Sequence, residues 1–570
     1  MSASSVSAQP ADVTVDLLVV GSGTGLAAAL SAHEQGLDVL VVEKTEYVGG
    51  STARSGGAFW IPANPVLAES GSKDSIERGE TYLRNLLGDT APEARWRAFL
   101  ANGPATVKML RRTTQLKFLW DRGYSDYHPE TPGGSASGRS VESRPFDAAK
   151  LGRDRKLLRP GVVEAPVPMP VTGADYKWMN LVARKPGRGM PRILRRVTQG
   201  IGGLAIGRRY VAGGQALAAG MFAGVRDAGI PIWRETTLVD LVRDGDRVVG
   251  AVVEHHGDRF TVTARRGVVL AAGGFDHDLA MRHEYQADFL ENWSLGSEGN
   301  TGDAIKTGAA HGADLAMMDQ AWWFPAVAPL LGEAPQVLLA ERSLPGSLMV
   351  DRHGRRFVNE SVGYMSFGQT VLDRERSGDP VGEMWLIFDQ RYRNSYVFAG
   401  ALYPRMPLPQ QWYDAGIAHR ASTVTDLARC AGLPESTLAE TLARFNAMAP
   451  AGIDDDFGRG NSAYDRYYGD PTVAPNPNLR ALDLQDLYAV KVVLSDLGTT
   501  GGLRADEYGR PLRTDGSPIE GLYAIGNTAG NVFGHYYPGA GATIGQGLVF
   551  GHIVATHAAT QPAIAADTLA

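Results

Sequence analysis

The chain has 570 residues, of which 44% are hydrophobic and 21% are charged, and its formal net charge is −6. This length exceeds a single typical core, so we expect at least two domains. The negative net charge argues against nucleic acid as the general partner. The only cysteine, Cys430, excludes an intrachain disulfide and a cysteine metal cluster, and we expect no metal site.

The hydropathy pattern and the cysteine usage predict a cytoplasmic protein. The first residues lack the basic start and the apolar core of a secretion signal. No run reaches the roughly 18 apolar residues of a membrane-spanning helix. A lone cysteine also suits a reducing compartment.

The first predicted unit is a strand, a glycine turn, a helix and a second strand. The apolar run 15–20 stops at the turn 21–25, a helix follows over 26–35, and the strand 37–42 ends at Glu43. Such a unit binds a dinucleotide, because the glycines admit a diphosphate, the helix N-terminus supplies N–H groups, and the acid can bind a ribose hydroxyl. Leu26 stands where the G-x-G-x-x-G pattern has its third glycine, so an ordinary βαβ turn is the alternative. The cofactor candidates here are Gly21, Gly23, Thr24, Gly25, Glu43 and Lys44.

A second glycine-rich loop follows directly, over residues 48–57. Its two glycine pairs flank small hydroxyl residues, so its backbone can lie against a flat or charged ligand while the hydroxyl groups donate hydrogen bonds. A flexible surface loop is the alternative. The candidates are Gly50, Ser51, Thr52, Ser55, Gly56 and Gly57.

The segment 67–120 is predicted to be largely helical and leads to an aromatic cluster over 118–130. The next segment, 151–210, is strongly basic, with 13 Lys/Arg against 3 Asp/Glu. It is predicted to be an inserted helical hairpin. Either it presents a solvated basic face, or it rests on an anionic membrane surface and helps a lipophilic substrate to enter.

Residues 211–274 return to the nucleotide-binding domain with a helix, a β-meander and a buried strand that ends at a glycine pair. A further glycine turn over 299–304 opens another helix. Repeated glycine turns suit a long ligand, more like FAD than a small nucleotide. The candidates in these turns are Ala272, Gly273, Gly302 and Asp303.

The aromatic-rich segment of roughly 280–490 is predicted to be a cap over the cofactor, and the first domain restarts near 497. A last buried strand ends at Gly526-Asn527, and residues 535–545 lead into an apolar helix. The N-terminus of that helix offers N–H groups to a flavin edge or to a substrate oxygen. The candidates here are Gly526, Asn527, Gly541, Thr543 and Ile544.

These motifs together resemble a known superfamily. The turn 21–25, the loop 49–57, the strand 270–274 and Gly526-Asn527 resemble the FAD-binding domain of the fumarate reductase/succinate dehydrogenase flavoproteins. Within it, Ser51–Pro65 and the Tyr-Pro-Gly-Ala-Gly sequence at 537–541 resemble 3-ketosteroid Δ1-dehydrogenases. The resemblance covers nearly the whole chain, and least securely the 151–210 insert.

The resemblance implies an α/β fold: a Rossmann-like FAD-binding domain with a parallel sheet and a β-meander, and an inserted α+β catalytic cap domain. We expect the FAD-binding domain over 1–280 and 491–570 and the cap over 281–490. The implied partners are a 3-ketosteroid substrate and an external, quinone-like electron acceptor. Since no histidine stands in Ser51-Thr52-Ala53, the FAD is expected to be non-covalent.

The resemblance also implies site roles in the 1,2-desaturation of steroid ring A. The Tyr537 hydroxyl and the Gly541 N–H would bind the C3 carbonyl oxygen and stabilise enolate charge. Tyr364 would abstract the C2 proton with help from Tyr127, because an ordinary tyrosine pKa of about 10 is too high for a base at neutral pH. Tyr124 competes with Tyr127 for the helper role. The C1 hydride would pass to the flavin, and an apolar steroid cleft is expected to be walled by Tyr124, Trp323, Phe324 and Phe533. A place in the hydrophobic core is the alternative for Trp323, Phe324 and Phe533.

Three alternatives stay open. A fumarate reductase-like enzyme needs an arginine acid and cationic clamps, but Tyr364 and Tyr537 stand at the corresponding positions. A 3-ketosteroid Δ4-(5α)-dehydrogenase is not expected to carry the Tyr-Pro-Gly-x-Gly loop. A non-catalytic flavoprotein would not need both tyrosine motifs.

Overall fold

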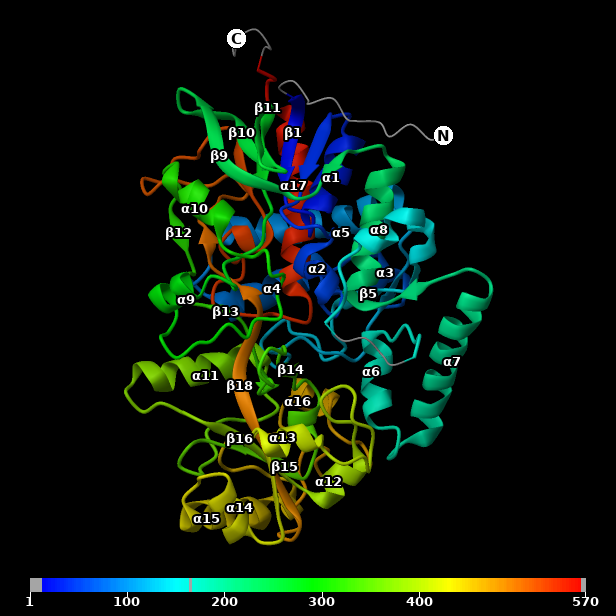
Figure 1. The fold of residues 1–570 in the computed structure, drawn as a ribbon, viewed down its shortest axis with the longest axis vertical. Coiled ribbons are helices and arrows are strands. Elements are labelled where there is room, and N and C mark those ends of the chain that lie inside the picture. Colours follow the sequence, from blue (N-terminus) through cyan, green and yellow to red (C-terminus); the bar gives the residue numbers. More distant parts are fainter. Residues whose placement is uncertain (1–12, 163–166, 565–570) are drawn as a thin grey trace.

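The computed structural model describes residues 13–162 and 167–564. Two regions, each built on a β-sheet, lie one above the other along the long axis, and strand β18 (Leu487–Thr499) runs from the lower region towards the upper one (Figure 1). In these residues no helix combines the length and the apolar character needed to cross a bilayer.

The upper region contains a seven-stranded sheet in the order β8-β2-β1-β11-β10-β9, with β20 also paired to β11. The pairs of β1 with β2 and β11, of β2 with β8 and of β11 with β20 are parallel, whereas β10 is antiparallel to β9 and β11. The expected combination of a parallel sheet and a β-meander is therefore confirmed. The strands are β1 (Val13–Val20), β2 (Val39–Val42), β8 (Ile232–Trp233), β9 (Thr236–Asp244), β10 (Arg247–His255), β11 (Asp258–Leu270) and β20 (Leu522–Ala524).

The helices α1 (Gly25–Glu34) and α17 (Ala542–Thr560) pack against each other beside this sheet (Figure 1). Small residues permit the close approach: a Cβ on Gly547 would lie 2.5 Å from the Thr24 hydroxyl, and one on Gly551 would lie 3.0 Å from the Ala28 nitrogen. Helix α8 (Gly213–Asp227) also packs on α1, and α5 (Glu93–Thr113) on both α1 and α17. The cofactor turn before α1 and the turn before α17 are thus held together by a rigid helix pair.

The lower region contains a six-stranded antiparallel sheet in the order β14-β13-β18-β16-β15, with β17 also paired to β18. Helix α11 (Tyr364–Arg376) packs on β13, while α14 and α15 form a separate apolar core with β15 and β16. The elements are β13 (Ala321–Val327), β14 (Gln336–Val337), β15 (Ser347–Val350), β16 (Met384–Asp389), β17 (Ala418–Ala421), α14 (Val424–Cys430) and α15 (Glu435–Met448).

Smaller elements connect and flank the two regions. A three-stranded sheet has the order β3-β5-β4, and β6 pairs with β7. These elements are α2 (Gly50–Arg54), β3 (Ala58–Trp60), α3 (Pro65–Glu69), α4 (Ile76–Leu87), β4 (Phe118–Trp120), β5 (Ser140–Ser143), β6 (Phe146–Asp147), β7 (Tyr210–Val211), α9 (Leu279–Tyr285), α10 (Asp303–Ala310), β12 (Leu315–Ala316), α12 (Gln390–Ser395), α13 (Gln410–Asp414), α16 (Ala463–Tyr467) and β19 (Gly502–Leu503), with 3₁₀ turns at Glu341–Ser343, Ala449–Ala451 and Gly526–Thr528.

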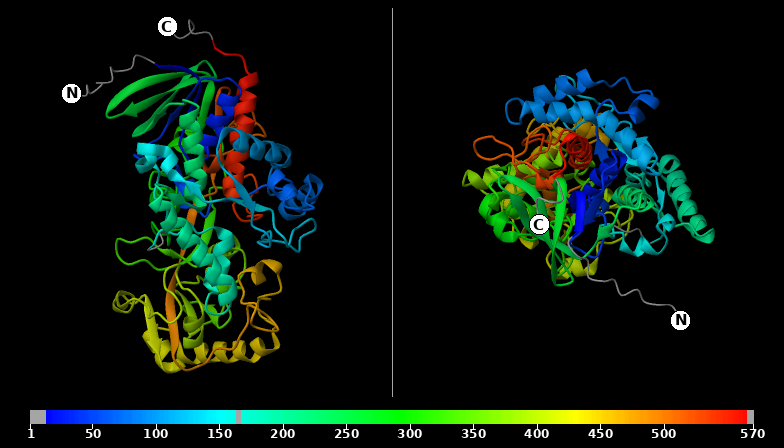
Figure 2. Two further views of the ribbon diagram at one scale, coloured as in Figure 1. Left: turned by 90° about the vertical axis from the view of Figure 1, so that its right-hand side faces the viewer. Right: turned by 90° about the horizontal axis from the view of Figure 1, so that it is seen from above.

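The basic segment 151–210 forms a 3₁₀ segment that begins at Ala148 and ends at Leu157, then α6 (Gly173–Asn180) and α7 (Pro186–Ala205). Helices α6 and α7 pack against each other. Helix α7 lies at the periphery of the molecule, as the view from above shows (Figure 2).

Candidate active site

One large cavity lies where the parallel strands of the upper sheet end and the lower region begins. Its volume is ≈ 1020 Å³, and its lining extends from the glycine turns to the loop before α6 and to β14 with the residues on either side of it. Crevices at the carboxyl ends of parallel strands are the usual ligand sites of such sheets. The cavity thus has a cofactor end at the upper sheet and a second, more apolar end next to α6 and the lower region.

Most of the predicted cofactor residues line the cofactor end. At Gly21, φ is +108° and a Cβ would lie 2.3 Å from the Ala271 carbonyl oxygen, so no other residue fits this turn. Gly25 and Gly302 are not in the lining; Gly25 packs against Val19, and Gly302 precedes α10 with φ +74°. The predicted cofactor residues in the lining are Gly21, Gly23, Thr24, Glu43, Lys44, Gly50, Ser51, Thr52, Ser55, Gly56, Gly57, Ala272, Gly273, Asp303, Gly526, Asn527, Gly541, Thr543 and Ile544.

Glu43 holds the first glycine turn against the end of β2. One carboxylate oxygen accepts hydrogen bonds from the Ser22 N–H (3.1 Å) and hydroxyl (2.5 Å), and the other from the Thr45 N–H (2.9 Å) and hydroxyl (2.8 Å). The carboxylate therefore orders the turn, and its predicted contact with a ribose would be added to these four bonds.

Ser51 in the second glycine loop is fixed by the segment around 299–304. Its hydroxyl accepts hydrogen bonds from the Ser297 N–H and the Asn300 side chain, each 2.9 Å long. The Asn300 amide also donates to the buried carboxyl of Asp276, whose pKa is raised to about 6 by burial and by the nearby Asp496. Two glycine turns far apart in the sequence are thus brought to one wall of the cavity.

Three tyrosines from distant parts of the chain meet at the second end of the cavity. The ring centroids of Tyr127, Tyr364 and Tyr537 lie 5.2 Å (Tyr127–Tyr364), 5.0 Å (Tyr127–Tyr537) and 5.5 Å (Tyr364–Tyr537) apart, all in edge-to-face contact. Tyr364 and Tyr537 line the cavity, and Tyr127 is buried directly behind them. The structure therefore brings together the three tyrosines that the resemblance singled out.

The loop that carries Tyr537 is anchored from several sides. The Pro538 carbonyl oxygen accepts hydrogen bonds from the Tyr127 N–H (3.0 Å) and from the Tyr82 hydroxyl (2.8 Å). A Cβ on Gly539 would lie 2.3 Å from the Trp60 ring, so the loop requires glycine there. Tyr127 and Tyr537 consequently keep a fixed mutual geometry.

Gly541 ends this loop and precedes the 19-residue helix α17. Its φ is +85°, and a Cβ would lie 2.0 Å from the Ala58 carbonyl oxygen. Its N–H donates to the Tyr537 hydroxyl oxygen over 3.2 Å. The two groups expected to form an oxyanion hole are therefore in contact, at the positive end of a long helix.

Burial controls the protonation of these tyrosines. It raises the pKa of Tyr364 and of Tyr127 well above 10, and that of Tyr537 to about 12. A hydrogen bond from Tyr127 acts in the opposite direction on the pKa of Tyr364 but does not outweigh burial. All three hydroxyl groups are thus protonated at neutral pH, which suits Tyr537 as a donor.

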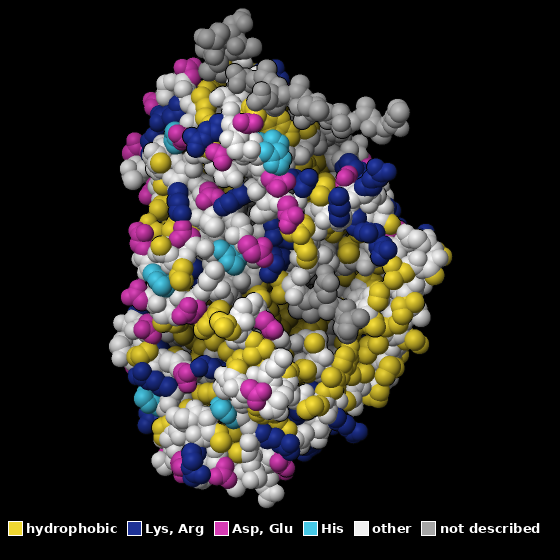
Figure 3. Space-filling model, viewed as in Figure 1, with side chains coloured by type: hydrophobic (Ala, Val, Ile, Leu, Met, Phe, Trp, Pro, Cys, Tyr) yellow, Lys and Arg dark blue, Asp and Glu magenta, His cyan; other side chains and the backbone are white. Residues whose placement is uncertain are grey.

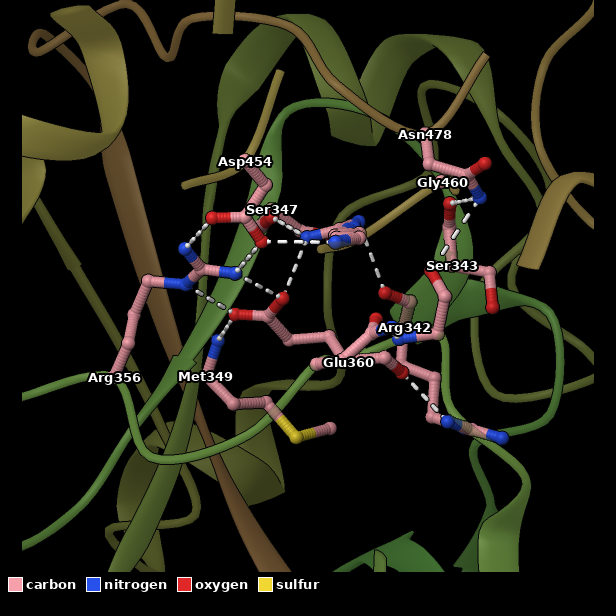
Figure 4. A network of polar contacts seen from close by, with 12 residues as sticks. Arg342, Ser343, Ser347, Met349, Arg356, Glu360, Asp454, Gly460 and Asn478 are labelled. Carbon is pink, nitrogen blue, oxygen red and sulfur yellow. Dashed lines mark hydrogen bonds and ion pairs between the residues drawn. The ribbon is translucent and has the colours of Figure 1, made fainter. Parts of the chain in front are cut away.

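Tyr364 is the first residue of α11, and a buried ion-pair network holds the segment in front of it (Figure 4). The Glu360 carboxylate accepts two 2.8 Å hydrogen bonds from Arg356, one of 3.2 Å from Arg459 and one of 3.1 Å from the Met349 N–H. Arg356 also binds Asp454. This network fixes the path of the chain into Tyr364.

Of the aromatic residues predicted to wall the cleft, some line the cavity and others lie on the opposite side of strand β13 or in the core. Phe324 and Tyr124 line the cavity, but Trp323 does not: it packs against Gly368 and lies 5.3 Å from the Arg282 guanidinium. Side chains alternate between the two faces of a strand, so Trp322, with its ring 4.7 Å from Tyr537, shares the site's side of β13. Period-2 alternation in Trp322-Trp323-Phe324 is the signal that sequence analysis did not use.

Phe533 also lies outside the cavity lining. Its ring contacts Trp60 (5.8 Å) and Phe99 (5.1 Å) in the core beneath the loop. It is fully buried there, because the chain turns inwards before it reaches Tyr537.

Sequence analysis missed a second group of tyrosines beside the site. Tyr464, Tyr467 and Tyr468 of the stretch Ala463-Tyr-Asp-Arg-Tyr-Tyr468 surround Tyr124, which stacks on Tyr467 at 4.5 Å. The density of tyrosines in this stretch is a usable signal. Two buried carboxyl groups, Asp121 and Glu142, also line the cavity, and nothing in their local sequence marks them.

Comparison with known proteins first identifies the class of protein to which the chain belongs. The FAD binding domain family matches residues 16–544, which is nearly the whole chain. The crystal structure of 3-ketosteroid Δ1-dehydrogenase from Sterolibacterium denitrificans in complex with 1,4-androstadiene-3,17-dione has a TM-score of 0.90 and 36% identity, and the match covers 96% of this chain and 99% of that one.

Two curated relatives narrow the assignment. The 3-oxosteroid 1-dehydrogenase of Mycolicibacterium smegmatis is 45% identical over 95% of this chain and 96% of its own length. The 4-oxocyclohex-2-ene-1-carboxylate 5-dehydrogenase of Sinomonas cyclohexanicum is 35% identical over 95% and 93%. The chain therefore belongs to the 3-oxosteroid 1-dehydrogenase group of the FAD-binding flavoproteins.

FAD is the cofactor of this family, and the cofactor end of the cavity fits it. The strand-end glycine turns give the backbone close access to a diphosphate, and a Cβ on Gly56 would meet nothing within 4 Å, so this loop leaves open space beside the ligand. Hydroxyl groups of Thr24, Ser51 and Thr52 face the same cavity. The structure and the family thus agree on an FAD-binding protein.

Proposed function

We propose that the protein catalyses the FAD-dependent 1,2-desaturation of ring A of 3-ketosteroids. One observation carries this proposal: the Tyr537 hydroxyl and the Gly541 N–H lie 3.2 Å apart in the same cavity as the cofactor turns, with Tyr364 and Tyr127 in contact with Tyr537. The 45% identity to a 3-oxosteroid 1-dehydrogenase supports the same reaction.

The first task of the site is to acidify the proton at C2. In the proposed complex, the hydrogen bond between the Gly541 N–H and the Tyr537 hydroxyl breaks, and both groups donate to the C3 carbonyl oxygen. Both are held in place before the substrate arrives, so little reorganisation is needed when negative charge develops on that oxygen. Stabilising the enolate lowers the pKa of the C2–H bond.

Tyr364 then receives the C2 proton. Its ring lies 5.5 Å from Tyr537, so it is adjacent to the position of the bound carbonyl. Tyr127, 5.2 Å away, is the neighbour that can exchange a proton with it. When bound, FAD supplies the acceptor for the hydride that leaves C1, and the electron pair of the C2–H bond forms the new C1–C2 double bond.

The charges in the cavity favour a neutral steroid over an oxocyclohexane carboxylate. Among the described residues of its lining, the cationic side chains are Lys44 and Arg54, at the cofactor end, where they bind Asp303 and Glu298. The opposite end carries the carboxyl groups of Asp121 and Glu142. A carboxylate substrate would therefore meet like charge without a cationic partner.

The decisive experiment is anaerobic mixing of the yellow protein with androst-4-ene-3,17-dione. We expect the flavin absorbance to bleach and a 1,4-diene to form. Bleaching by a 5α-saturated 3-ketosteroid but not by the 4-ene would transfer the assignment to a Δ4-(5α)-dehydrogenase. No bleaching by either would overturn the steroid assignment, and parallel mixing with 4-oxocyclohex-2-ene-1-carboxylate would test the second relative's reaction.

We further propose that α7 rests on an anionic membrane surface. Its outer face carries exposed apolar side chains, of which Leu194 is 61% and Ile201 51% exposed. In Figure 3 these apolar side chains form a ridge on the right of the molecule, beside a hollow. Residues 167–171 and Met179, which precede α7 in the sequence, line the active-site cavity, so a membrane-bound α7 would keep a lipophilic substrate near the opening.

A cluster of basic side chains lies between α7 and the body of the protein. A second cavity of ≈ 640 Å³ lies between α7 and β6, lined by the cations Lys117, Arg144, Lys150, Arg195, Arg196 and Arg208 and by a single acid, Asp147. Basic groups next to an exposed apolar helix face are the usual arrangement for binding anionic lipids.

Liposome flotation tests this membrane contact. Leu194→Glu combined with Ile201→Glu should abolish flotation with vesicles that contain phosphatidylglycerol, whereas Ile453→Glu, at an exposed apolar residue of the lower region, should not. Flotation should weaken at high salt. Equal flotation of the double variant and the wild type would contradict the proposal.

We also propose that the FAD-binding domain spans 1–280 and 491–570 and the cap 281–490. The protein is further proposed to be cytoplasmic, to bind FAD non-covalently and to pass electrons to a quinone-like acceptor.

A further inference from the structure

The proposed reaction leaves a physical problem at Tyr364. Burial raises its pKa well above 10, so the hydroxyl is protonated at neutral pH, and a neutral phenol is not a base. It can receive the C2 proton only if it releases its own hydroxyl proton at the same time. A buried chain of groups that ends in a better base would solve this problem.

Hydroxyl groups lead away from Tyr364 towards the start of α6. Behind Tyr364 lies Tyr127, and the Tyr127 and Tyr124 hydroxyl oxygens are 3.4 Å apart. Tyr124 stacks face to face on Tyr467 at 4.5 Å and lies edge to face with Tyr468, the neighbour of Tyr467, at 5.5 Å. The Tyr467 hydroxyl donates to an Asp121 carboxylate oxygen over 3.3 Å.

Asp121 belongs to a buried carboxyl pair with Glu142. Their exposed fractions are 3% and 1%, and both line the cavity. A Cβ on Gly173 would lie 3.2 Å from a Glu142 carboxylate oxygen and 3.5 Å from one of Asp121, so both groups face the same point at the start of α6. The Gly173 and Ala174 N–H groups donate to Glu142 over 2.7 and 3.0 Å.

Burial and the surrounding groups bring the pKa values of Asp121 and Glu142 close to neutral pH. Burial raises the pKa of Asp121 to about 6, with Asp175 in the same direction and Tyr467 and Lys177 against it. Burial and the charge of Asp121 raise the pKa of Glu142 to about 7, against the N–H groups of α6. Two interacting carboxyl groups of this kind share a proton near pH 7 and can both accept and release one.

Lys177 is a cationic neighbour of the pair, and its charge acts on Asp121. It is half-buried on α6, and its ammonium lies 4.2 Å from the Tyr467 ring centroid. Burial lowers its pKa to about 8, so it too can release a proton under ordinary conditions.

We propose that Asp121 and Glu142 are the terminal proton acceptor of the reaction, reached from Tyr364 through Tyr127, Tyr124 and Tyr467. As the C2–H bond breaks, its proton binds the Tyr364 oxygen, and each hydroxyl group passes its own proton to the next. Between Tyr124 and Tyr467, whose rings stack at 4.5 Å, a water molecule carries the proton across. One proton arrives at the carboxyl pair and leaves from there to solvent. The electron pair of the C2–H bond stays on the steroid, so the relay needs no further oxidant. This inference rests on the proposed function.

The test separates proton transfer from the flavin step. Holoenzyme reduced with dithionite cannot accept a hydride, so incorporation of deuterium at C2 of androst-4-ene-3,17-dione in D₂O, measured by mass spectrometry, reports the relay alone. Wild-type exchange should rise with pH between about 5 and 8, because only an ionised pair accepts a proton.

Two conservative variants interrupt the relay without removing its shape. Asp121→Asn and Tyr467→Phe should each slow exchange by about 10²-fold. In Glu142→Gln the amide oxygen can keep only one of the two α6 N–H bonds, because Gly173 and Ala174 donate to different carboxylate oxygens. One of the two titrating groups is also gone, so the pH profile should move to lower pH and become less broad. Glu341→Gln, at a buried carboxyl with a pKa of about 7 that accepts a hydrogen bond from the Leu339 N–H, is the matched control and should keep the wild-type profile.

The outcomes are distinct. Wild-type exchange rates and an unchanged pH profile in both Asp121→Asn and Tyr467→Phe would overturn the relay, even if steroid still bleaches the oxidised enzyme. If wild-type enzyme neither bleaches nor exchanges, the proposed function itself fails. Circular dichroism and bound flavin verify that each variant is folded.

Discussion

At the scale of single residues, the backbone of Gly541 fixes the relative position of its N–H and the Tyr537 hydroxyl. Gly541 needs a left-handed backbone and has no room for a Cβ next to Ala58. Its N–H nevertheless points at the Tyr537 hydroxyl. A donor pair set by the backbone keeps its direction when nearby side chains change, which suits a group that must meet developing charge.

Replacement of Tyr364 by phenylalanine tests the proton-accepting role. Tyr364→Phe should lose nearly all turnover while it keeps the yellow cofactor, because the ring still fills the same space. Tyr392→Phe, which removes a buried hydroxyl from the lower-region core where it bonds to the Glu341 carbonyl oxygen, is the matched control. Near-wild-type turnover of Tyr364→Phe would assign the role to Tyr127.

Replacement of Tyr537 by phenylalanine tests the oxyanion hole. The loss of one donor should cost about 3–4 kcal/mol of transition-state stabilisation, which is about 10²–10³-fold in kcat. Substrate binding should weaken as well, since the hydroxyl also binds the ground-state carbonyl. Steady-state kinetics with androst-4-ene-3,17-dione gives both quantities, and an unchanged kcat would exclude Tyr537 from the hole.

At the scale of elements, the ion-pair network around Glu360 connects the start of α11 to β15 and to the loop before α16 (Figure 4). Burial raises the pKa of Glu360, but Arg356 and Arg459 outweigh it and the pKa is lowered. Glu360→Gln should therefore destabilise the protein by about 3–5 kcal/mol, because it leaves buried cationic charge without compensation.

Because the pKa of Glu360 is lowered in the folded protein, its contribution to the free energy of unfolding should decrease as the pH falls. The stabilisation by Glu360 is complete above the pKa of an unfolded glutamate, about 4.3, and is lost as the pH falls through the folded value. Urea unfolding at pH 7 and at pH 4 should show a smaller difference between wild type and Glu360→Gln at the lower pH. A difference that grows on acidification would contradict this account.

Local sequence patterns were sufficient to predict the glycine turns and the strands that lead into them, because both depend on neighbouring residues. The alternation of side chains along β13 would have placed Trp322 rather than Trp323 on the same side as Phe324. The meeting of Tyr127, Tyr364 and Tyr537 followed only from the family resemblance. Asp121 and Glu142 could not be found at all, since Asp121 follows β4, Glu142 lies within β5, and the two meet only when these strands pair.

At the scale of the whole molecule, the cavity is built from both regions, so the cofactor should stabilise the complete fold. Adding FAD to apoprotein should raise the free energy of unfolding by about 4 kcal/mol when free FAD is 1,000 times its Kd. Differential scanning calorimetry would reveal the corresponding rise in Tm. An unchanged Tm would mean that FAD binds folded and unfolded chains alike.

The same holoenzyme tests non-covalent binding. Precipitation with trichloroacetic acid should leave the flavin in the supernatant, since Ser51-Thr52-Ala53 offers no histidine for attachment. A yellow pellet would contradict this expectation.

The pairing of α1 with α17 has a consequence for the diversification of such enzymes. One helix begins at the cofactor turn and the other after Gly541, so the cofactor turn and the proposed oxyanion donors are held by one pair of packed helices in the upper region. The rest of the pocket comes from elsewhere, from the chain before α6 and the loops after β14. Substrates with other ring systems can therefore be accommodated by changes in the pocket walls, while the position of the reacting carbon atoms relative to the cofactor stays the same.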